Sequence, residues 1–245
     1  MTVARWLGAV RHELDRCAST NDEADRLARA GAPHGAVVTA REQTAGRGRA
    51  GRSWYSPPGD NLYLSVVLRP PLAPRDVPPI ALAAGVGVCD AVNAAGVPAS
   101  VKWPNDVLVD GHKIAGVLAE ASCRGERIDH VVLGIGVNVN GTAFPGGLRT
   151  PPTSLRLALG GTPVDLPAFR DALLAHLERW LDRLFSGGVA AIAEAWCTRC
   201  PAIGRPVVAD GVAGVARGLD ADGALIVDTP AGPRRVVAGD VEVAP

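Results

Sequence analysis

The sequence has only two lysines, Lys102 and Lys113, whereas the other 23 of its 25 basic residues are arginines. Both lysines fall in the segment 101–116, which reads VKWPNDVLVDGHKIAG. Lysine is a compact point charge on a flexible stem, whereas arginine is a planar fork. A chain that uses arginine almost everywhere else has kept lysine where arginine does not fit, so both lysines are candidate functional residues. The alternative is that compositional bias left two lysines by chance.

Other absences exclude whole classes of protein. The net charge is zero, which argues against a dedicated binder of nucleic acid or of anionic membranes. No uninterrupted apolar run reaches about 18 residues, so no spanning helix is expected. Residues 1–8 lack the apolar core of a signal peptide. The five cysteines, an odd number, fit a reducing compartment, and the sequence therefore predicts a cytoplasmic protein.

The cysteines themselves give no clear site. Cys197 and Cys200 form a Cys-x-x-Cys pair, but a zinc site would need two more ligands at suitable spacing. Cys17, Cys89 and Cys123 stand alone. A thioredoxin-type pair opens a helix after a strand, whereas this pair closes a predicted helix. We therefore interpret the pair as structural or incidental.

The length and texture of the chain predict two domains. A chain of 245 residues with 47% hydrophobic content suits a large domain plus a small one. After Pro201 the pattern changes to short valine-rich runs separated by Asp-Gly and Gly-Pro pairs, which is typical of a small antiparallel barrel or sandwich. We expect a first domain over 1–200 and a second over 201–245. The second is too short for a large core, so it should lean on the first.

Periodicity and punctuation predict the elements of the first domain. Asn21 can cap a helix, acidic residues follow it, and Gly31 ends the segment. The alanine- and glycine-rich helix over 80–95 has small side chains and should pack close to a sheet. Helices are expected over 21–30, 80–95, 152–159, 165–185 and 188–199, and strands over 35–41, 61–69, 99–109, 112–121 and 128–139.

A loop rich in glycine and arginine over 46–53, GRGRAGRS, invites two interpretations that we reject. It matches the dinucleotide-binding pattern G-x-G-x-x-G, and it matches a P-loop with Arg52 in place of the lysine. Both motifs need the glycines to open a helix whose amides meet phosphate. The segment that follows, SWYSPPG, is unsuited to a helix because of its prolines.

The same loop still predicts an anion site. Arg47, Arg49 and Arg52 place three guanidinium groups on a short flexible segment, and the glycines between them allow close backbone approach. Guanidinium groups bind phosphate or carboxylate through paired hydrogen bonds. A nucleic-acid segment and a solvated loop are the alternatives, and the neutral net charge and the lack of aromatics among the arginines weaken the first of these.

Three blocks now stand together in order. They are 43–57 (QTAGRGRAGRSWYSP), 102–106 (KWPND) with 113–116 (KIAG), and 133–140 (LGIGVNVN), with 19–21 (STN) upstream. This set closely resembles the biotin protein ligases, also called biotin–[acetyl-CoA-carboxylase] ligases. The motif matches run from residue 19 to about 140, and the rest of the chain matches in length and texture.

The resemblance implies a fold and a reaction. The implied fold is α+β, with a mixed sheet and flanking helices like those of class II aminoacyl-tRNA synthetases, followed by a small SH3-like β-barrel. The implied substrates are biotin and ATP with Mg²⁺, which form biotinyl-5′-AMP and pyrophosphate. The biotinyl group then passes to a lysine of a biotin carboxyl carrier domain. No ligands for Mg²⁺ are assigned by the motifs.

The resemblance also implies roles for single residues. Lys113 would be the central cation that bridges the biotin carboxylate and the α-phosphate, and Asp106 would serve the incoming lysine or the metal. The implied catalytic residues are Lys113, Arg47, Arg49 and Asp106. Those implied to bind biotin are Ser19, Thr20, Asn21, Gln43, Arg47, Gly48, Arg49, Lys113 and Gly116. Those implied to bind the nucleotide are Arg49, Arg52, Trp54, Lys102, Asn105 and Asn138, although plain core packing is an alternative for Trp54.

Partners and rivals complete the expectations. Because Ser19 falls near the start, we expect the monofunctional type without an N-terminal DNA-binding domain, and no specific DNA binding. A weak homodimer is left open. The rival functions are a lipoate–protein ligase-like enzyme, whose family lacks the glycine-arginine block, and a non-catalytic module that binds a ligand or RNA.

Overall fold

The computed structural model describes residues 5–125 and 127–244, so the first four residues of the N-terminal segment considered above lie outside the described residues. A large sheet contains the strands β1 (Arg11–Cys17), β2 (Val37–Gln43), β3 (Leu62–Leu68), β4 (Ser100–Lys102), β5 (Asp106–Val109), β6 (His112–Arg124) and β7 (Arg127–Val137). Its strand order is β1-β2-β3-β7-β6-β5-β4. The first pair is parallel and the others are antiparallel, so the sheet is mixed.

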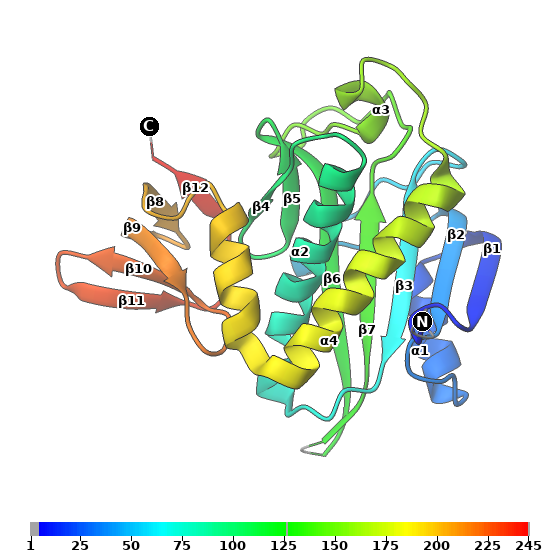
Figure 1. Ribbon diagram of the computed structural model, residues 1–245, viewed down its shortest axis with the longest axis horizontal. Helices are drawn as coiled ribbons and strands as arrows, with labels where there is room; N and C mark the ends of the chain where they lie inside the picture. Colours follow the sequence, from blue (N-terminus) through cyan, green and yellow to red (C-terminus); the bar gives the residue numbers. More distant parts are fainter. Residues whose placement is uncertain (1–4, 126, 245) are drawn as a thin grey trace.

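A second, smaller sheet follows at the C-terminal end. Its five antiparallel strands lie in the order β11-β10-β9-β8-β12 (Figure 1). They are β8 (Pro206–Ala209), β9 (Val212–Leu219), β10 (Leu225–Thr229), β11 (Gly232–Val236) and β12 (Val241–Val243). The helices are α1 (Thr20–Arg29), α2 (Pro78–Ala94), α3 (Leu155–Ala158) and α4 (Leu166–Arg199), and short 3-10 turns occur at η1 (Arg49–Gly51) and η2 (Pro74–Asp76). The predicted α+β class, with a mixed sheet and a C-terminal antiparallel β module, is confirmed.

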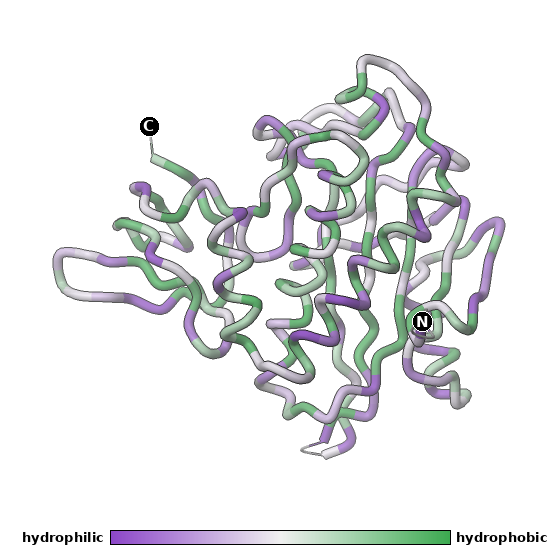
Figure 2. Tube along the Cα trace, in the orientation of Figure 1, coloured by the Kyte–Doolittle hydropathy of each residue, from purple (hydrophilic) through white to green (hydrophobic). Residues whose placement is uncertain are grey.

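The two faces of the large sheet carry different helices because successive side chains of a strand point to opposite faces. On β7, Leu133 and Ile135 belong to the main core, which the sheet shares with α2 and α4. Val132 points the other way and packs with Ala24 and Ala28 of α1. In Figure 1, α2 and α4 cover the near face of the sheet, and Figure 2 shows hydrophobic residues concentrated along the central strands and α2.

Helix α2 packs most closely against another helix. A Cβ added at Gly87 would lie 3.2 Å from the Cα of Leu177, so the small side chain lets α2 and α4 approach each other. The sequence predicted close packing of this helix against a sheet. The sheet does lie under α2, but the glycine serves the contact with α4.

Several sequence-based predictions need correction. The expected strand over 99–109 is two antiparallel strands, β4 and β5, because residues 103–105 form a turn around Pro104, which has no backbone N–H for a ladder. The N-cap of α1 is Ser19, whose side chain accepts a hydrogen bond from the backbone N–H of Asn21. Asn21 therefore lies inside the helix, where it is buried. Strand β1 was missed because its sequence, RHELDRC, is mostly charged. The helix expected over 152–159 is only one turn, α3, which begins after the cap at Ser154.

The C-terminal helix and sheet are tied to the large sheet. Helix α4 is interrupted at Gly188, whose φ is 70°, where the sequence predicted a break between two helices. The buried indole N–H of Trp103 donates to the carbonyl of Gly223 at 3.2 Å, which links the large sheet to the smaller one.

The division of the chain into two domains at residue 200 stays a prediction. No helix in the described part of the chain is both long and apolar enough to cross a membrane.

Candidate active site

One pocket lies over the face of the large sheet that carries α1. It is lined by every residue that the sequence predicted for the biotin and nucleotide site, although these residues come from six separate segments of the chain. These residues are Ser19, Thr20, Asn21, Gln43, Arg47, Gly48, Arg49, Arg52, Trp54, Lys102, Asn105, Asp106, Lys113, Gly116 and Asn138. The structure thus brings the predicted site residues together, and the role of each one stays a prediction.

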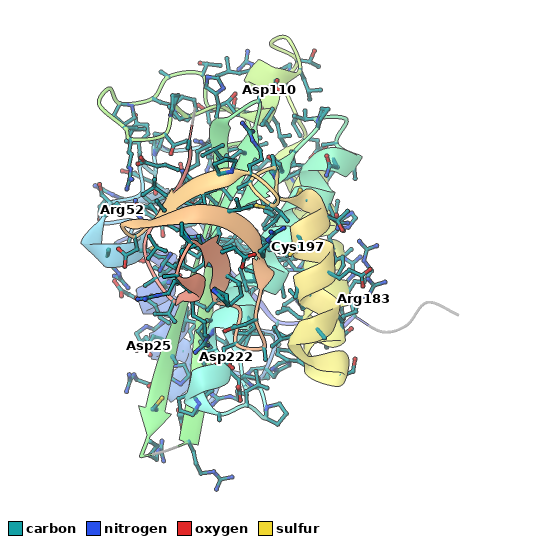
Figure 3. All side chains as sticks on the ribbon, turned by 90° about the vertical axis from the view of Figure 1, so that its left-hand side faces the viewer. Asp25, Arg52, Asp110, Arg183, Cys197 and Asp222 are labelled. Atoms are coloured by element: carbon teal, nitrogen blue, oxygen red, sulfur yellow. The ribbon has the colours of Figure 1, made fainter. Side chains whose placement is uncertain are left out.

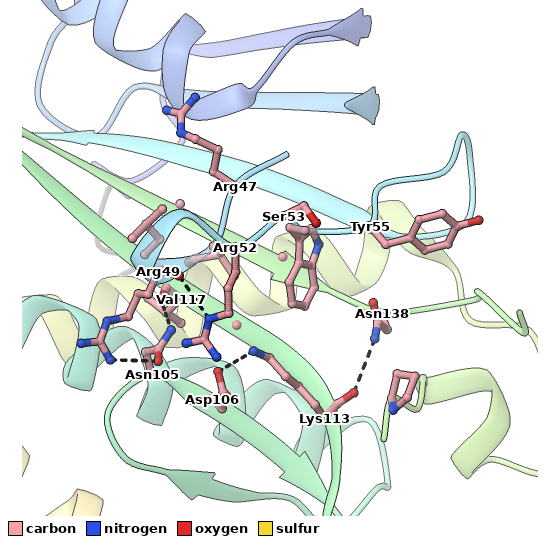
Figure 4. Close-up of a pocket in the computed structure, with 18 of the residues that line it drawn as sticks. Arg47, Arg49, Arg52, Ser53, Tyr55, Asn105, Asp106, Lys113, Val117 and Asn138 are labelled. Carbon is pink, nitrogen blue, oxygen red and sulfur yellow. Dashed lines mark hydrogen bonds and ion pairs between the residues drawn. The ribbon is translucent and has the colours of Figure 1, made fainter. Parts of the chain in front are cut away.

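An ion pair between neighbouring strands lies at the centre of the pocket. Lys113 Nζ on β6 lies 2.6 Å from Asp106 Oδ1 on β5, and both side chains are mostly buried (Figure 4). The backbone of Lys113 is fixed on both sides, since its N–H donates to Pro151 O at 2.7 Å and its carbonyl accepts from Thr153 N at 3.0 Å. An ammonium group has three donors, so Lys113 can hold Asp106 and an anion together.

The base of the pocket is sheet backbone covered by one indole. A Cβ at Gly136 would lie 2.4 Å from the ring of Trp54, and one at Gly116 would lie 3.1 Å from it. The ring also lies 5.4 Å from Lys113 Nζ, a cation–π contact. The indole nitrogen of Trp54 is buried without a hydrogen-bond partner among the described residues. Gly116, which the resemblance implied to bind biotin, lies against Trp54 here.

A polar wall faces this base from the start of α1. Gln43 Oε1 accepts hydrogen bonds from the backbone N–H of Thr20 at 2.8 Å and from its hydroxyl at 3.0 Å. Asn21 Nδ2 donates to Glu120 at 2.5 Å, and Asn21 Oδ1 lies 2.6 Å from the Ser65 hydroxyl. These amides and hydroxyls are therefore held in fixed orientations, which suits a small polar ring.

The arginines of the loop point in two directions. Arg47 forms a paired contact with Asp22 of α1 at 2.8 and 2.7 Å, and Figure 4 shows its guanidinium directed toward that helix. Arg49 and Arg52 point into the pocket. Arg49 donates to Asn105 at 3.4 Å, and Arg52 donates to the Arg49 carbonyl at 3.2 Å. The turn between them needs positive φ, 54° at Ala50 and 72° at Gly51.

The partly buried guanidinium of Arg49 has donors to spare. Burial is the main cause that lowers the pKa of Arg49, but an arginine stays charged in proteins. Its side chain makes one hydrogen bond, to Asn105, among the described residues. A partly desolvated cation with unused N–H groups favours an anionic ligand such as phosphate.

The remaining predicted residues differ in their contacts. Asn105 Nδ2 donates to Val117 O at 2.7 Å, and Asn138 Nδ2 donates to Thr153 O at 2.9 Å, so both amides brace the backbone around Lys113. Lys102 makes no ion pair with any residue that the structure describes.

Several residues near the site were not predicted, among them four polar side chains. Ser65 and Glu120 contact Asn21 from β3 and β6, and Arg149 and Asp240 line the pocket. Asp240, from the C-terminal sheet, lies 3.6 Å from Arg52 and forms an ion pair with Arg149. Figure 3 shows Arg52 beside the C-terminal strands. The polar Ser65 inside the apolar run LYLSVVL was a usable signal for the first of these, whereas no local pattern marks the other three.

A metal cage is not part of this pocket. No group of three or more His, Cys, Asp or Glu side chains within residues 5–125 and 127–244 is placed to hold a metal ion. The Cys-x-x-Cys pair lies at the end of α4, as predicted, with both thiols free and Cys200 buried. Burial raises the pKa of the Cys200 thiol to about 11, which suits a structural residue.

Comparisons with known proteins agree with this arrangement. Residues 14–138 match the model of the biotin/lipoate A/B protein ligase family, and residues 203–243 match that of the biotin protein ligase C-terminal domain. A biotin–[acetyl-CoA-carboxylase] ligase of Paracoccus denitrificans is 40% identical over 238 residues, which cover 93% of this chain and 98% of the relative. The chain belongs to the biotin protein ligase family. The resemblance inferred from the motifs and the ligase function that it implied are thereby confirmed.

Further relatives extend the similarity to solved structures. The bifunctional ligase/repressor BirA of Bacillus subtilis is 34% identical over 94% of this chain and 72% of its own length. A biotin protein ligase from Aquifex aeolicus, solved in complex with biotin and ATP, superposes with a TM-score of 0.80 at 26% identity, covering 96% of this chain and 99% of that one. A Leishmania major biotin protein ligase in complex with biotinyl-5-AMP gives a TM-score of 0.62 at 26% identity over 94% of this chain and 99% of that one.

Proposed function

We propose that this ligase activates biotin with MgATP to biotinyl-5′-AMP and transfers the biotinyl group to a lysine of a biotin carboxyl carrier domain. The observation that carries the proposal is the meeting of a lysine–aspartate pair, two inward arginines and a fixed polar wall in one pocket. Each of these features meets a separate need of the reaction.

The first half-reaction joins two anions. A carboxylate oxygen of biotin attacks the α-phosphorus of ATP, and pyrophosphate leaves with the electron pair of the broken P–O bond. Lys113, Arg49 and Arg52 line the pocket and supply the positive charge that offsets the repulsion between carboxylate and phosphates. Preorganised cations of this kind are the usual source of rate in such steps.

The polar wall suits the ureido ring of biotin. That ring has one carbonyl acceptor and two N–H donors, which match hydroxyl and amide groups held as they are at Ser19, Thr20 and Asn21. The dithiolane ring of lipoate has no such groups. The match of residues 203–243 to the biotin protein ligase C-terminal domain also favours biotin over lipoate.

In the second half-reaction the amine of the acceptor lysine attacks the carbonyl carbon of the mixed anhydride. The C–O bond to AMP breaks, AMP leaves with the electron pair, and the nitrogen loses a proton. Asp106 is a carboxylate within the pocket that can accept this proton or attract the acceptor ammonium. In our proposal Arg49 and the loop around it cover the adenylate until the acceptor arrives.

Mg²⁺ would enter with the triphosphate. This ion usually takes one or two protein carboxylates together with substrate phosphates, and Asp106 and Asp240 are carboxylates that line the pocket. When bound, the ion neutralises phosphate charge. In our proposal the protein does not bind DNA specifically, because its net charge is zero. We also propose that it is located in the cytoplasm.

Pyrophosphate exchange into ATP tests the proposal directly. We expect exchange that depends on biotin, followed by biotin transfer to a purified carrier domain. Exchange that depends on lipoate would assign the chain to the rival enzyme class. No exchange with either acid, from a folded protein, would leave a non-catalytic binding module and refute the proposal.

A further inference from the structure

A fully buried histidine on β7 lies between two carboxylates. The side chain of His130 is 0% exposed, and both of its ring nitrogens have acidic partners. Nδ1 lies 2.9 Å from Asp129 Oδ2, and Nε2 lies 2.8 Å from Asp25 Oδ1 on α1. None of these three residues lines the pocket, so all three lie outside the candidate active site.

The contacts of the ring favour one protonation state. An ionised carboxylate only accepts hydrogen bonds, so each ring nitrogen of His130 must donate one, and a ring that donates from both nitrogens is an imidazolium cation. The two acids do favour their ionised forms. A hydrogen bond from Arg29 is the main cause that lowers the pKa of Asp25, and the bond with His130 is the main cause that lowers the pKa of Asp129.

The surrounding charges extend this pattern beyond the three residues. Arg29 Nε lies 2.7 Å from Asp25, and Arg124 Nη2 lies 3.1 Å from Asp129. Charges therefore alternate in sign on both sides of the ring. The charged groups that face it from the elements packed around it are Asp25 and Arg29 on α1, Asp129 on β7, Arg124 on β6 and Arg69 after β3.

The same face of β7 fixes α1 at three successive levels. Asn21 lies against Gly134, where an added Cβ would be 2.2 Å from its Oδ1. Ala24 and Ala28 pack on Val132. Asp25, one helical turn after Asn21, bonds His130. Only the last of these contacts is charged, so His130 sets where the helix lies along the strand more specifically than the apolar contact does.

The first turn of α1 is the polar wall of the pocket. Ser19, Thr20 and Asn21 line it, and their partners Gln43, Ser65 and Glu120 are on the sheet side. A shift of the helix along β7 would therefore misalign the wall with those partners. A misplacement of about 1 Å is enough to cost a site much of its activity.

We propose that His130, as a buried cation, is a positioning residue for the biotin site, joining Asp25 to Asp129 so that α1 keeps the polar wall in place. The inference rests on the proposed function only for the identity of the ligand. It concerns the charge of the ring and the position of a helix, and both can be measured without biotin.

The first test is the protonation of the ring in the wild-type protein. With ¹⁵N-labelled histidine, NMR distinguishes an imidazolium, in which both ring nitrogens carry protons, from neutral tautomers. The chain has five histidines, and His130→Gln identifies the signal by its loss. We expect an imidazolium at neutral pH. A neutral His130 ring there would overturn the proposal, and if His130→Gln fails to fold, substitution of the other four histidines identifies the same signal by elimination.

The second test separates positioning from catalysis. His130→Gln keeps hydrogen-bonding groups but removes the charge, and we expect a biotin KM raised roughly tenfold, with kcat for exchange changed much less. Amide hydrogen exchange of α1 should be faster in this variant with no ligand present. His12→Gln, on β1 and outside the pocket, is the matched control and should change neither.

A double-mutant cycle asks whether His130 acts through Asp25. In His130→Gln with Asp25→Asn, two amides face each other, and the rise in biotin KM should be smaller than the product of the two single effects. The positioning role would be refuted if the two substitutions acted independently on the biotin KM. It would also be refuted if a folded His130→Gln protein had an unchanged biotin KM and unchanged amide hydrogen exchange of α1. Wild-type protein without biotin-dependent exchange would instead refute the proposed function, and the NMR and hydrogen-exchange tests would still decide the rest.

Discussion

Two residues of the same type can have very different surroundings in one pocket. Lys102 and Lys113 both line the site, but Lys113 is paired with Asp106 and lies beside the ring of Trp54, whereas Lys102 has no ion-pair partner among the described residues. A compact ammonium can contact a carboxylate and an anion at once within a narrow space, whereas a planar guanidinium needs a wider space to do so. The scarcity of lysine in the sequence thus coincides with a physical need at position 113.

Removing the cation at position 113 should abolish adenylation. In Lys113→Ala the developing negative charge loses its central partner and Asp106 is left unpaired, so we expect the rate of biotinyl-AMP formation to fall about 10²-fold or more. Lys113→Arg should also be poor. Single-turnover adenylation measures the loss, with Arg217→Ala in the C-terminal sheet as a surface control. Near-full adenylation by a folded Lys113→Ala protein would show that the role is wrongly assigned.

Arg49 should hold the intermediate more than it assists its formation. Loss of a charge-assisted hydrogen bond of about 1.5–3 kcal/mol would raise the escape rate of biotinyl-AMP by roughly one to two orders of magnitude. Arg49→Gly should therefore still form the adenylate but label lysines of an unrelated protein. The measurement is a biotin blot after incubation with biotin, MgATP and a lysine-rich bystander. Labelling equal to that of wild type, with intact adenylate formation, would count against the proposed seal.

At the scale of elements, the arginine loop is held by polar contacts rather than by packing. Arg47 pairs with Asp22 on α1, Arg49 bonds Asn105 next to β5, and Arg52 lies near Asp240 before β12. Residues 47–53 form a small turn in which Gly48 N donates to Arg52 O at 2.7 Å. The contacts of Arg47 and Arg52 are exposed, and exposed polar contacts are weak and are easily exchanged for a charged ligand.

The loop should become protected when substrates bind. Trypsin can cut after Arg47, Arg49 and Arg52, and without ligand we expect cleavage within 44–52, because no apolar side chain anchors that stretch to the core. Biotin with ATP should suppress the cleavage as the arginines close on the adenylate. Gel electrophoresis over time gives the rates, with cleavage at other arginines as the internal control. Equal cleavage with and without substrates would contradict loop closure.

The turn before β2 should make the stability of the protein sensitive to acid. His34 Nδ1 accepts a hydrogen bond from the Arg69 amide at 2.9 Å, and burial is the main cause that lowers the pKa of His34 below its ordinary 6.5. The folded protein therefore binds fewer protons than the unfolded chain. The contribution of His34 to the stability of the folded protein is fully present above pH 6.5, and it is lost as the pH drops toward the lowered pKa of His34.

The variant His34→Gln removes this titration while keeping a side-chain acceptor. Urea midpoints measured between about pH 5 and pH 7 should then depend less steeply on pH, whatever their absolute level. Some dependence should remain, because burial also lowers the pKa of His176. An unchanged slope in His34→Gln would show that His34 is not a source of the acid sensitivity.

At the scale of the whole molecule, the C-terminal sheet takes part in the pocket of the large sheet. Asp240, just before β12, lines the pocket, lies near Arg52 and pairs with Arg149, which also contacts Glu242. The buried bond from Trp103 to Gly223 fixes the two sheets relative to each other. The smaller sheet can therefore influence how the arginine loop meets a nucleotide.

Asp240→Asn tests that influence. When Asp240 loses its charge, Arg52 and Arg149 lose a shared ion-pair partner. Because these side chains are partly exposed, we expect only a severalfold rise in the KM for ATP. Asp228→Asn, which breaks the Arg217 pair in the same sheet outside the pocket, is the matched control. Pyrophosphate exchange at varied ATP gives both values. Equal KM values for the two variants would exclude a specific role for Asp240.

The sequence alone determined the ligase family and, through the resemblance that its motifs carry, the class of fold and many of the residues that meet in the pocket. Local patterns carried this information, because the glycine-arginine loop, the KWPND block and the KIAG block are contiguous runs whose chemistry is visible without a structure. Strands and helices with clear periodicity, such as those over 61–69 and 80–95, were also visible. Charged β1 was not, since its place at the sheet edge removes the alternation of an apolar face.

Only the tertiary structure decided which distant residues act on the pocket. The bonds of His130 to α1 and of Asp240 to Arg149 join residues separated by about a hundred positions, and no local pattern marks either pair. The same holds for the direction of Arg47, which depends on Asp22 and Glu120 from two different elements. Hydrophobic periodicity reports which face of an element is buried, whereas the pairing of charges depends on how those faces meet.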